Sequence, residues 1–212
     1  MQIFVTGASG WIGSALVPEL IGAGHKVVGL ARSDASAAAL VAAGTEAYRG
    51  VLDALRTATA ASDGVIHLAF KHDLAFAAGD FAGAAAADRR AIEMIGDELA
   101  GSDRPFVIAS GTLGLSSDGV ATERDGLRPA ADAASGADIA ELRPANAWLT
   151  LSYAERGVRA SVVRLPPTVH GAGDYGFIAA LVGIARDKGV SGHPGDGSQR
   201  WPAVHRHDAA RL

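Results

Sequence analysis

The segment Thr6-Gly7-Ala8-Ser9-Gly10-Trp11-Ile12-Gly13 constrains the fold of this chain more than any other stretch. It follows the apolar run 3–5 and opens a stretch with apolar residues at helical spacing,. Its glycines permit a tight turn, a close approach of backbone to pyrophosphate, and close packing of helix on strand. The free N–H groups at the helix start then face the anion, which predicts a dinucleotide site. The alternative is an ordinary tight turn, because the spacing is Gly-x-x-Gly-x-x-Gly and not the commoner Gly-x-Gly-x-x-Gly.

Apolar strand-like runs alternate with helical stretches along most of the chain. After the first strand, further strands are expected at 26–30, 47–49, 65–69, 105–109 and 159–165,. Helices are expected at 33–43, 52–61, 74–99 with interruptions near Gly79 and Gly83, and 143–156,. This order predicts an α/β fold with a doubly wound parallel sheet. We expect residues 1–170 to form a dinucleotide-binding Rossmann domain, residues 171–212 to begin a substrate-binding portion, and 116–138 to form a lid-like loop or to be disordered.

Composition narrows the class of protein. The net charge is −4, without a basic cluster, which argues against a nucleic-acid partner,. The chain has no cysteine, so disulfides, thiolate catalysis and cysteine-ligated metals are excluded,. Because no apolar run has membrane length and the first strand begins at Gln2, we expect no membrane association and a cytoplasmic location. The chain stops one turn into a helical pattern that Asp208 is expected to cap, so we expect a fragment of a longer protein,.

Several further segments occur in a fixed order after the glycine turn. They are His67-Leu68-Ala69, Ser110, Arg164-Leu165-Pro166-Pro167-Thr168-Val169-His170-Gly171, Gly195-Asp196-Gly197-Ser198 and Val204-His205-Arg206-His207-Asp208. Together with the turn, they resemble the extended short-chain dehydrogenase/reductase family, the group with NAD-dependent epimerases and dehydratases. The resemblance covers essentially the whole chain. It implies a nicotinamide dinucleotide and hydride transfer to or from a small-molecule substrate.

The family's catalytic pair is a Tyr followed four residues later by a Lys, and this sequence departs from it. Tyr occurs only at 48, 153 and 175, and the residues four positions later are Leu52, Gly157 and Ala179. The region where the pair belongs, roughly 137–146, offers Asp138, Glu141 and Arg143 instead. The chain therefore resembles the atypical branch of the family, which keeps the glycine turn and lacks the usual active-site residues.

The same resemblance predicts which residues hold the cofactor. Ala31 falls where an acidic residue would bind the ribose of NAD, and the adjacent Arg32 could neutralise a 2′-phosphate,. This favours NADP, with NAD as the alternative if Asp34 takes the ribose and Arg32 is only a solvated surface residue. Val51 stands where relatives often carry the Asp that contacts adenine. The expected cofactor contacts are Thr6, Gly7, Ser9, Gly10, Trp11, Ile12, Gly13, Arg32, Ser33, Leu52, Leu68, Ala69, Phe70, Pro166 and Val169.

Candidate catalytic groups follow the ends of the central strands. Ser110 and Thr112 stand where a family hydroxyl orients the substrate carbonyl, although either hydroxyl could simply bond local backbone. Lys71 and His72 could replace the missing acid or base, or form an exposed polar loop. His170 replaces the family's usual Tyr after Val169 and could donate a proton or be structural. The spacing of the histidines at 67, 72, 170, 193, 205 and 207 resembles no metal-ligand motif, so we expect no metal site,.

The leading hypothesis is an NADP-dependent oxidoreductase or epimerase-like enzyme that acts on a small carbonyl or hydroxyl compound. The competing hypothesis is a non-catalytic NADP sensor or regulatory module that has kept the fold and lost the chemistry. The helices around 85–99 and 143–156 resemble the pair through which relatives form a homodimer. Trp148 and Tyr153 would then be interface anchors, or else core residues.

Overall fold

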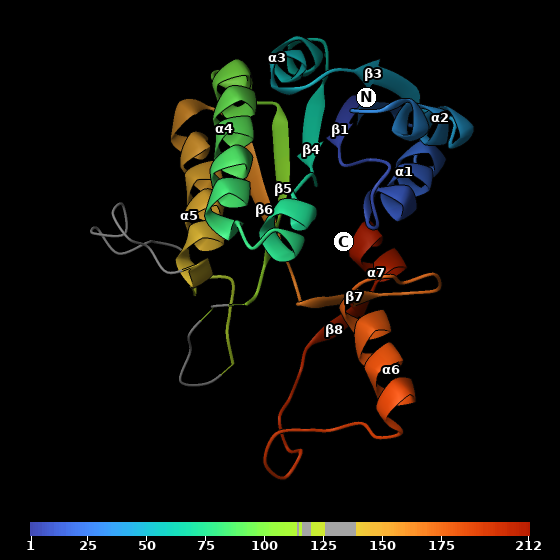
Figure 1. Ribbon diagram of the computed structural model, residues 1–212. Helices are drawn as coiled ribbons and strands as arrows, with labels where there is room; N and C mark the ends of the chain where they lie inside the picture. The colour runs from blue at the N-terminus through green and yellow to red at the C-terminus, as the bar shows by residue number, and fades with distance from the viewer. Residues whose placement is uncertain (114, 116–119, 126–138) are drawn as a thin grey trace.

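A computed structural model describes residues 1–113, 115, 120–125 and 139–212, and its centre is a six-stranded parallel sheet (Figure 1). The strand order is β3-β2-β1-β4-β5-β6. The strands are β1 (Gln2–Thr6), β2 (Lys26–Ala31), β3 (Glu46–Arg49), β4 (Gly64–His67), β5 (Pro105–Gly111) and β6 (Arg159–Leu165). The order reverses between β1 and β4, and ligands of such sheets bind outside the carboxyl ends of the strands at that point.

Helices cover both faces of the sheet. On one face α1 (Gly13–Gly22) and α2 (Asp34–Ala42) bury apolar residues such as Val17 and Leu40 against β1 and β2. On the other face, α3 (Leu52–Ala60), α4 (Phe81–Leu99) and α5 (Ile139–Ser152) pack in a row, with Phe4, Phe106 and Ile92 in the core. The predicted doubly wound α/β fold is confirmed.

The segment between β4 and α4 differs in detail from the prediction. It holds a short π-helix, η1 (Asp73–Ala77), and the chain then breaks at Gly79 as expected. The expected interruption at Gly83 is wrong, because α4 begins at Phe81 and runs through it. The Asp80 carboxylate caps the helix by accepting the Gly83 N–H at 2.8 Å,. A side chain at position 83 would strike that carboxylate, so the glycine serves the cap.

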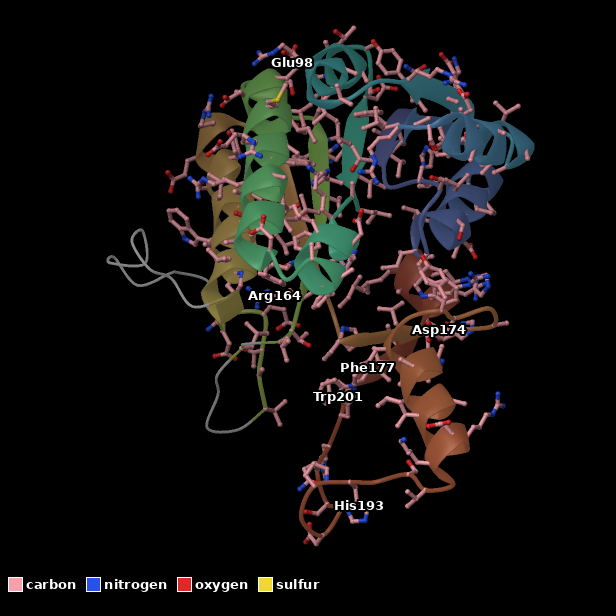
Figure 2. The ribbon with its side chains drawn as sticks, viewed as in Figure 1. Glu98, Arg164, Asp174, Phe177, His193 and Trp201 are labelled. Carbon is pink, nitrogen blue, oxygen red and sulfur yellow. The ribbon has the colours of Figure 1, made fainter. Side chains whose placement is uncertain are left out.

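A second, two-stranded parallel sheet lies below the carboxyl edge of the first (Figure 1). It pairs β7 (Thr168–His170) with β8 (Ala203–His205), and α6 (Phe177–Lys188) follows β7. Figure 2 shows Phe177 and Trp201 facing each other, with ring centroids 5.7 Å apart. The last helix, α7 (Arg206–Arg211), packs on α1. Its cap is His205, whose side chain accepts the His207 N–H, so the expectation that Asp208 caps it is wrong.

The predicted 143–156 helix is confirmed as α5, which begins earlier, plus the 3₁₀ turn η2 (Tyr153–Arg156). The predicted 116–138 loop falls mostly outside the described residues, and the division at residue 170 stays a prediction. In the described part of the chain, no helix is long and apolar enough to cross a membrane.

Candidate functional site

The glycine turn connects β1 to α1 and leaves no room for side chains at two of its glycines. Gly7 has φ +70°, and a Cβ there would lie 2.9 Å from the Ala69 backbone nitrogen. A Cβ on Gly13 would lie 2.2 Å from the Gly7 carbonyl oxygen. Gly10 is exposed and donates its N–H to that same oxygen at 2.9 Å. The turn is therefore a bare-backbone cradle at the positive end of a helix, which fits a dinucleotide pyrophosphate.

The second sheet contacts the glycine turn through Trp11. The Trp11 indole donates to the Val169 carbonyl at 2.7 Å, and the Arg206 guanidinium carbon lies 4.5 Å from the centre of its ring. These contacts hold β7 and the start of α7 against the head of α1. Among the described residues, the N–H groups of Trp11 and Ile12 have no hydrogen-bond acceptor, which leaves them available to an anion.

Four buried polar side chains join the end of β1 to α4 and α5. Thr6 Oγ1 lies 2.6 Å from His67 Nδ1, and His67 Nε2 lies 3.1 Å from Asp88 Oδ1. Asn146 donates to the second Asp88 oxygen at 2.8 Å. Because Thr6 Oγ1 also accepts the Ala69 N–H at 3.3 Å, its hydrogen is free for His67 Nδ1,. His67 then carries its proton on Nε2, an assignment that satisfies each of these contacts.

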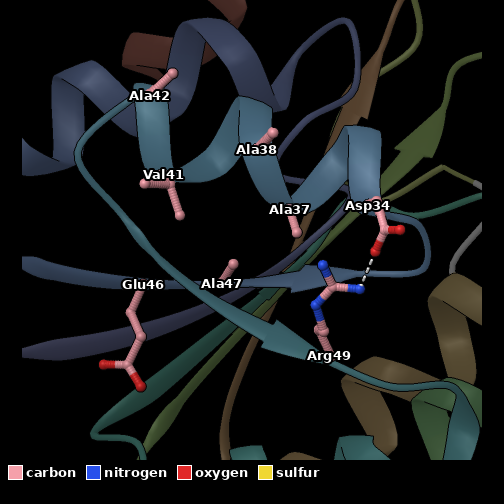
Figure 3. A pocket seen from close by; sticks show the side chains of 8 residues that line it. All are labelled: Asp34, Ala37, Ala38, Val41, Ala42, Glu46, Ala47 and Arg49. Atoms are coloured by element: carbon pink, nitrogen blue, oxygen red, sulfur yellow. Dashed lines mark hydrogen bonds and ion pairs between the residues drawn. The ribbon is translucent and has the colours of Figure 1, made fainter.

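The carboxyl end of β2 carries the residues expected near the adenosine. Arg32 and Ser33 are exposed, and Ser33 caps α2 in a capping box with Ser36,. Asp34 forms an ion pair with Arg49, which ends the neighbouring strand β3 (Figure 3). The hollow drawn there lies between α2 and β3; alanines and Val41 line its floor, and the charged residues of its lining are Asp34, Glu46 and Arg49, of which Asp34 and Arg49 already pair with each other. Asp34 and Arg49 thus engage each other, and the exposed Arg32 directly follows the end of β2.

Beyond the end of β4, the two predicted site residues Phe70 and His72 lie together with Arg143 of α5. The His72 and Phe70 rings lie 5.0 Å apart, and the Arg143 guanidinium carbon lies 4.2 Å from the Phe70 ring centre. Partial burial and the nearby Arg143 charge lower the pKa of His72, against the opposite effects of a hydrogen bond with the Phe70 backbone and of the Asp73 and Asp88 charges. Because its pKa is lowered from 6.5, the His72 imidazole is mainly neutral at pH 7,. Because the residue is exposed, a ligand can reach it.

The other predicted catalytic residues lie at separate places along the same edge. Ser110 is buried near the end of β5, and the Thr112 N–H donates to the Leu165 carbonyl at 2.9 Å. Lys71 is exposed directly before η1. His170, by contrast, lies in the second sheet, with its ring centroid 5.5 Å from that of His205. In the described part of the chain no histidine or carboxylate cluster could hold a metal ion.

Two residues of the site were not among the expected contacts. Arg143 reaches the edge of the sheet from α5 and donates from Nη2 to the Ala109 carbonyl at 2.8 Å. Burial lowers its pKa, and the Asp88 charge acts in the opposite direction. Asp88 gives no sequence signal, but Arg143 does, because it stands in the region where the family's Tyr–Lys pair belongs.

A family model and two known proteins are similar in sequence to this chain. The model of the NAD dependent epimerase/dehydratase family matches residues 3–97. An uncharacterised protein of Schizosaccharomyces pombe is 46% identical, and the alignment covers 100% of this chain and 69% of that protein. An uncharacterised protein of Saccharomyces cerevisiae is 43% identical, with 100% and 69% covered.

Solved structures show the same architecture. MoeE5, solved in complex with UDP-glucose and NAD, superposes with a TM-score of 0.74 at 27% sequence identity. The superposition covers 100% of this chain and 70% of the MoeE5 chain. The UDP-glucose 4-epimerase of Thermotoga maritima, solved with UDP-glucose, gives a TM-score of 0.73 at 21% identity, with 100% and 71% covered. The second likeness, at this identity, supports the fold alone.

Proposed function

Because this chain belongs to the NAD-dependent epimerase/dehydratase family, we propose that it binds NADP at the glycine turn and transfers hydride between the nicotinamide and a small carbonyl or hydroxyl compound. The observation that carries the proposal is the cradle itself. Its backbone excludes side chains at Gly7 and Gly13, and it opens on the same sheet edge as the ends of β4 and β5. A dinucleotide lying across the switch point between β1 and β4 would place its nicotinamide at those strand ends.

The preference for NADP over NAD rests on the end of β2. Arg32 is exposed there, Ala31 carries no charge, and the Asp34 carboxylate is paired with Arg49. The exposed guanidinium of Arg32 can form charge-assisted hydrogen bonds with a 2′-phosphate, which a bare ribose does not offer,. The test compares NADPH and NADH affinities of wild type, Arg32→Ala and Lys26→Ala, because Lys26 lies at the opposite end of β2. Only Arg32→Ala should weaken NADPH, by roughly tenfold or more. Wild type that binds NADH as tightly as NADPH would contradict the preference, and tighter binding of NADH would favour NAD, the cofactor bound to MoeE5.

The bound cofactor would supply the hydride, and the chain must move the matching proton. Reduction of a carbonyl adds hydride to carbon and a proton to oxygen, and oxidation of an alcohol reverses both. His72 suits the proton-accepting role, because its lowered pKa keeps it neutral at pH 7,. Lys71, Ser110, Thr112 and His170 remain the other candidates, with Ser110 suited to orient the substrate oxygen from the end of β5.

The activity test follows the absorbance of NADPH with a panel of small aldehydes, ketones and oxo acids. A parallel panel of alcohols and UDP-glucose is presented with NADP⁺ and NAD⁺. Turnover that falls in Ser110→Ala or His72→Gln, and stays unchanged in an exposed control such as Arg90→Gln, supports the proposal. Absence of turnover with every compound, by a protein that binds NADPH, would overturn the catalytic part of it.

One observation favours the second candidate function, a non-catalytic NADP sensor. No Tyr of the sequence is followed four residues later by a Lys. A sensor would bind NADPH tightly without turnover, and Lys71→Ala and His72→Ala would leave its function unchanged. A large rate loss in either variant would exclude the sensor.

We also propose a homodimer through α4 and α5, which pack side by side on one face of the sheet. Tyr153 is a core residue, because its ring packs over Gly96 and its hydroxyl donates to Asp97 Oδ1 at 3.0 Å. Trp148 on α5 is partly exposed and is the anchor that we propose. Sedimentation of Trp148→Glu should show a monomer where the wild type shows a dimer; the same mass for both would contradict this.

A further inference from the structure

Arg143 occupies a fixed position at the edge of the sheet where the substrate would react. Its guanidinium stacks on Phe70, which follows β4, with 4.2 Å between the guanidinium carbon and the ring centre. Nη2 donates to the Ala109 carbonyl of β5 at 2.8 Å. The Phe70 ring and the Ala109 carbonyl together hold the guanidinium at this place. A guanidinium has further N–H donors besides the one that Ala109 accepts, and these can bind a ligand.

The charge of Arg143 has no ion-pair partner among the residues that the structure describes. Asp88 is the carboxylate whose charge acts on it, but His67 and Asn146 already bind the two Asp88 oxygens. A partly buried guanidinium loses hydration, and a charged group in such a place is stabilised by a counter-charge with matching hydrogen bonds. The arrangement therefore favours an anionic ligand at Arg143.

We propose that Arg143 binds a carboxylate group of the substrate, so that the substrate is a small oxo acid or hydroxy acid. This inference rests on the proposed function for the position of the reacting carbon, which lies next to the carboxylate. A planar carboxylate suits the in-plane N–H groups of a stacked guanidinium, since two parallel hydrogen bonds can form. Lys71, which directly follows Phe70 in the sequence, adds a second positive charge on the same edge. Arg143 thus sets substrate class in the region where the family's catalytic pair belongs.

The test is a binding measurement that needs no turnover. The full chain, saturated with NADP⁺, is titrated by calorimetry with oxamate, a planar and unreactive carboxylate. Its uncharged methyl ester and inorganic phosphate are titrated in parallel. The variants are Arg143→Gln, Arg143→Lys and the control Arg90→Gln, which removes an exposed arginine from α4. Arg143→Lys keeps the positive charge and loses the planar pair of donors, so it carries the test if Arg143→Gln does not fold.

We expect oxamate to bind the wild type and Arg90→Gln equally, and more tightly than the ester or phosphate. Its affinity should fall at least about 30-fold in Arg143→Gln and about tenfold in Arg143→Lys. Unchanged oxamate affinity in Arg143→Lys, equal binding of ester or phosphate, or no oxamate binding by the wild type would each overturn the inference. Oxamate binding that depends on Arg143, in a protein without NADPH turnover, would contradict the proposed catalysis but support the carboxylate site. A failure of the proposed catalysis is therefore distinguishable from a failure of the carboxylate site.

Discussion

Substitution of Gly13 by alanine tests the glycine turn most sharply. An added Cβ would lie 2.2 Å from the Gly7 carbonyl oxygen and 2.6 Å from that of Ala8. Cβ contacts below 3.0 Å essentially do not occur, so the first oxygen must move by 3.0 − 2.2 = 0.8 Å. Both oxygens belong to backbone, and neither can rotate away as a side chain would. The first turn of α1 must therefore shift relative to β1.

The magnitude follows from the cost of inserting one methyl group into a packed region. Such overpacking costs about 1–3 kcal/mol, which changes the unfolding equilibrium about 5- to 150-fold. The shift also moves N–H groups at the head of α1 away from the pyrophosphate. Since a hydrogen bond to a charged group contributes about 1.5–3 kcal/mol, losing one should weaken NADPH binding at least about tenfold.

The assay combines urea unfolding, followed by circular dichroism, with a fluorescence titration of NADPH. The matched control is Gly22→Ala at the end of the same helix, where a Cβ would meet nothing within 4 Å. That control should gain about 0.5–1 kcal/mol of stability and keep its NADPH affinity. If Gly13→Ala is as stable as wild type and binds NADPH as tightly, the account of the turn is refuted.

Three further predictions follow from the structure. Burial and the Asp97 hydrogen bond raise the pKa of Tyr153 to about 12, from 10.0, so stability present below pH 10.0 should be lost as pH rises toward 12,. Tyr153→Phe should lose about 1 kcal/mol at pH 7 and flatten that decline in urea melts, whereas an equally steep decline would contradict the assignment. Asn146→Leu leaves one Asp88 oxygen unpaired, so thermal melts should show a loss of about 1–3 kcal/mol, and a melt like the wild type's would refute the buried network,. Arg143→Gln should raise the pKa of His72, measured by NMR, because the guanidinium charge lowers it; an unchanged or lower value would mean that the two groups do not interact.

The fold could be predicted because its signals are local. Buried parallel strands are short apolar runs, helices have their own period, and glycines mark the turns between them. The exceptions come from side chains that act on the backbone. Gly83 looks like a helix breaker in sequence, but it stands at the position that the Asp80 cap requires. Likewise His205 caps α7, a role in which histidine is uncommon and the sequence favours Asp208,.

The candidate site could be predicted only in part, because its contacts join residues distant in sequence. The glycine turn, Phe70 and His72 follow strand ends and can be placed from the strand pattern. The link from His67 to Asp88 spans 21 residues and that from Asp88 to Asn146 spans 58, so no local pattern carries them. The contact of Arg143 with Phe70 depends in the same way on how α5 packs against β5 and β6. The side chain of Leu52, an expected cofactor contact, lies outside the described residues.

The central claim is that the glycine turn holds a dinucleotide whose nicotinamide lies at the ends of β4 and β5. A crystal structure of the full chain with NADPH tests it most directly. The account predicts pyrophosphate oxygens within about 3.5 Å of the Trp11 and Ile12 nitrogens, and the nicotinamide ring beside Phe70 and Ser110. A pyrophosphate bound away from the head of α1, or a nicotinamide directed toward β3, would contradict it.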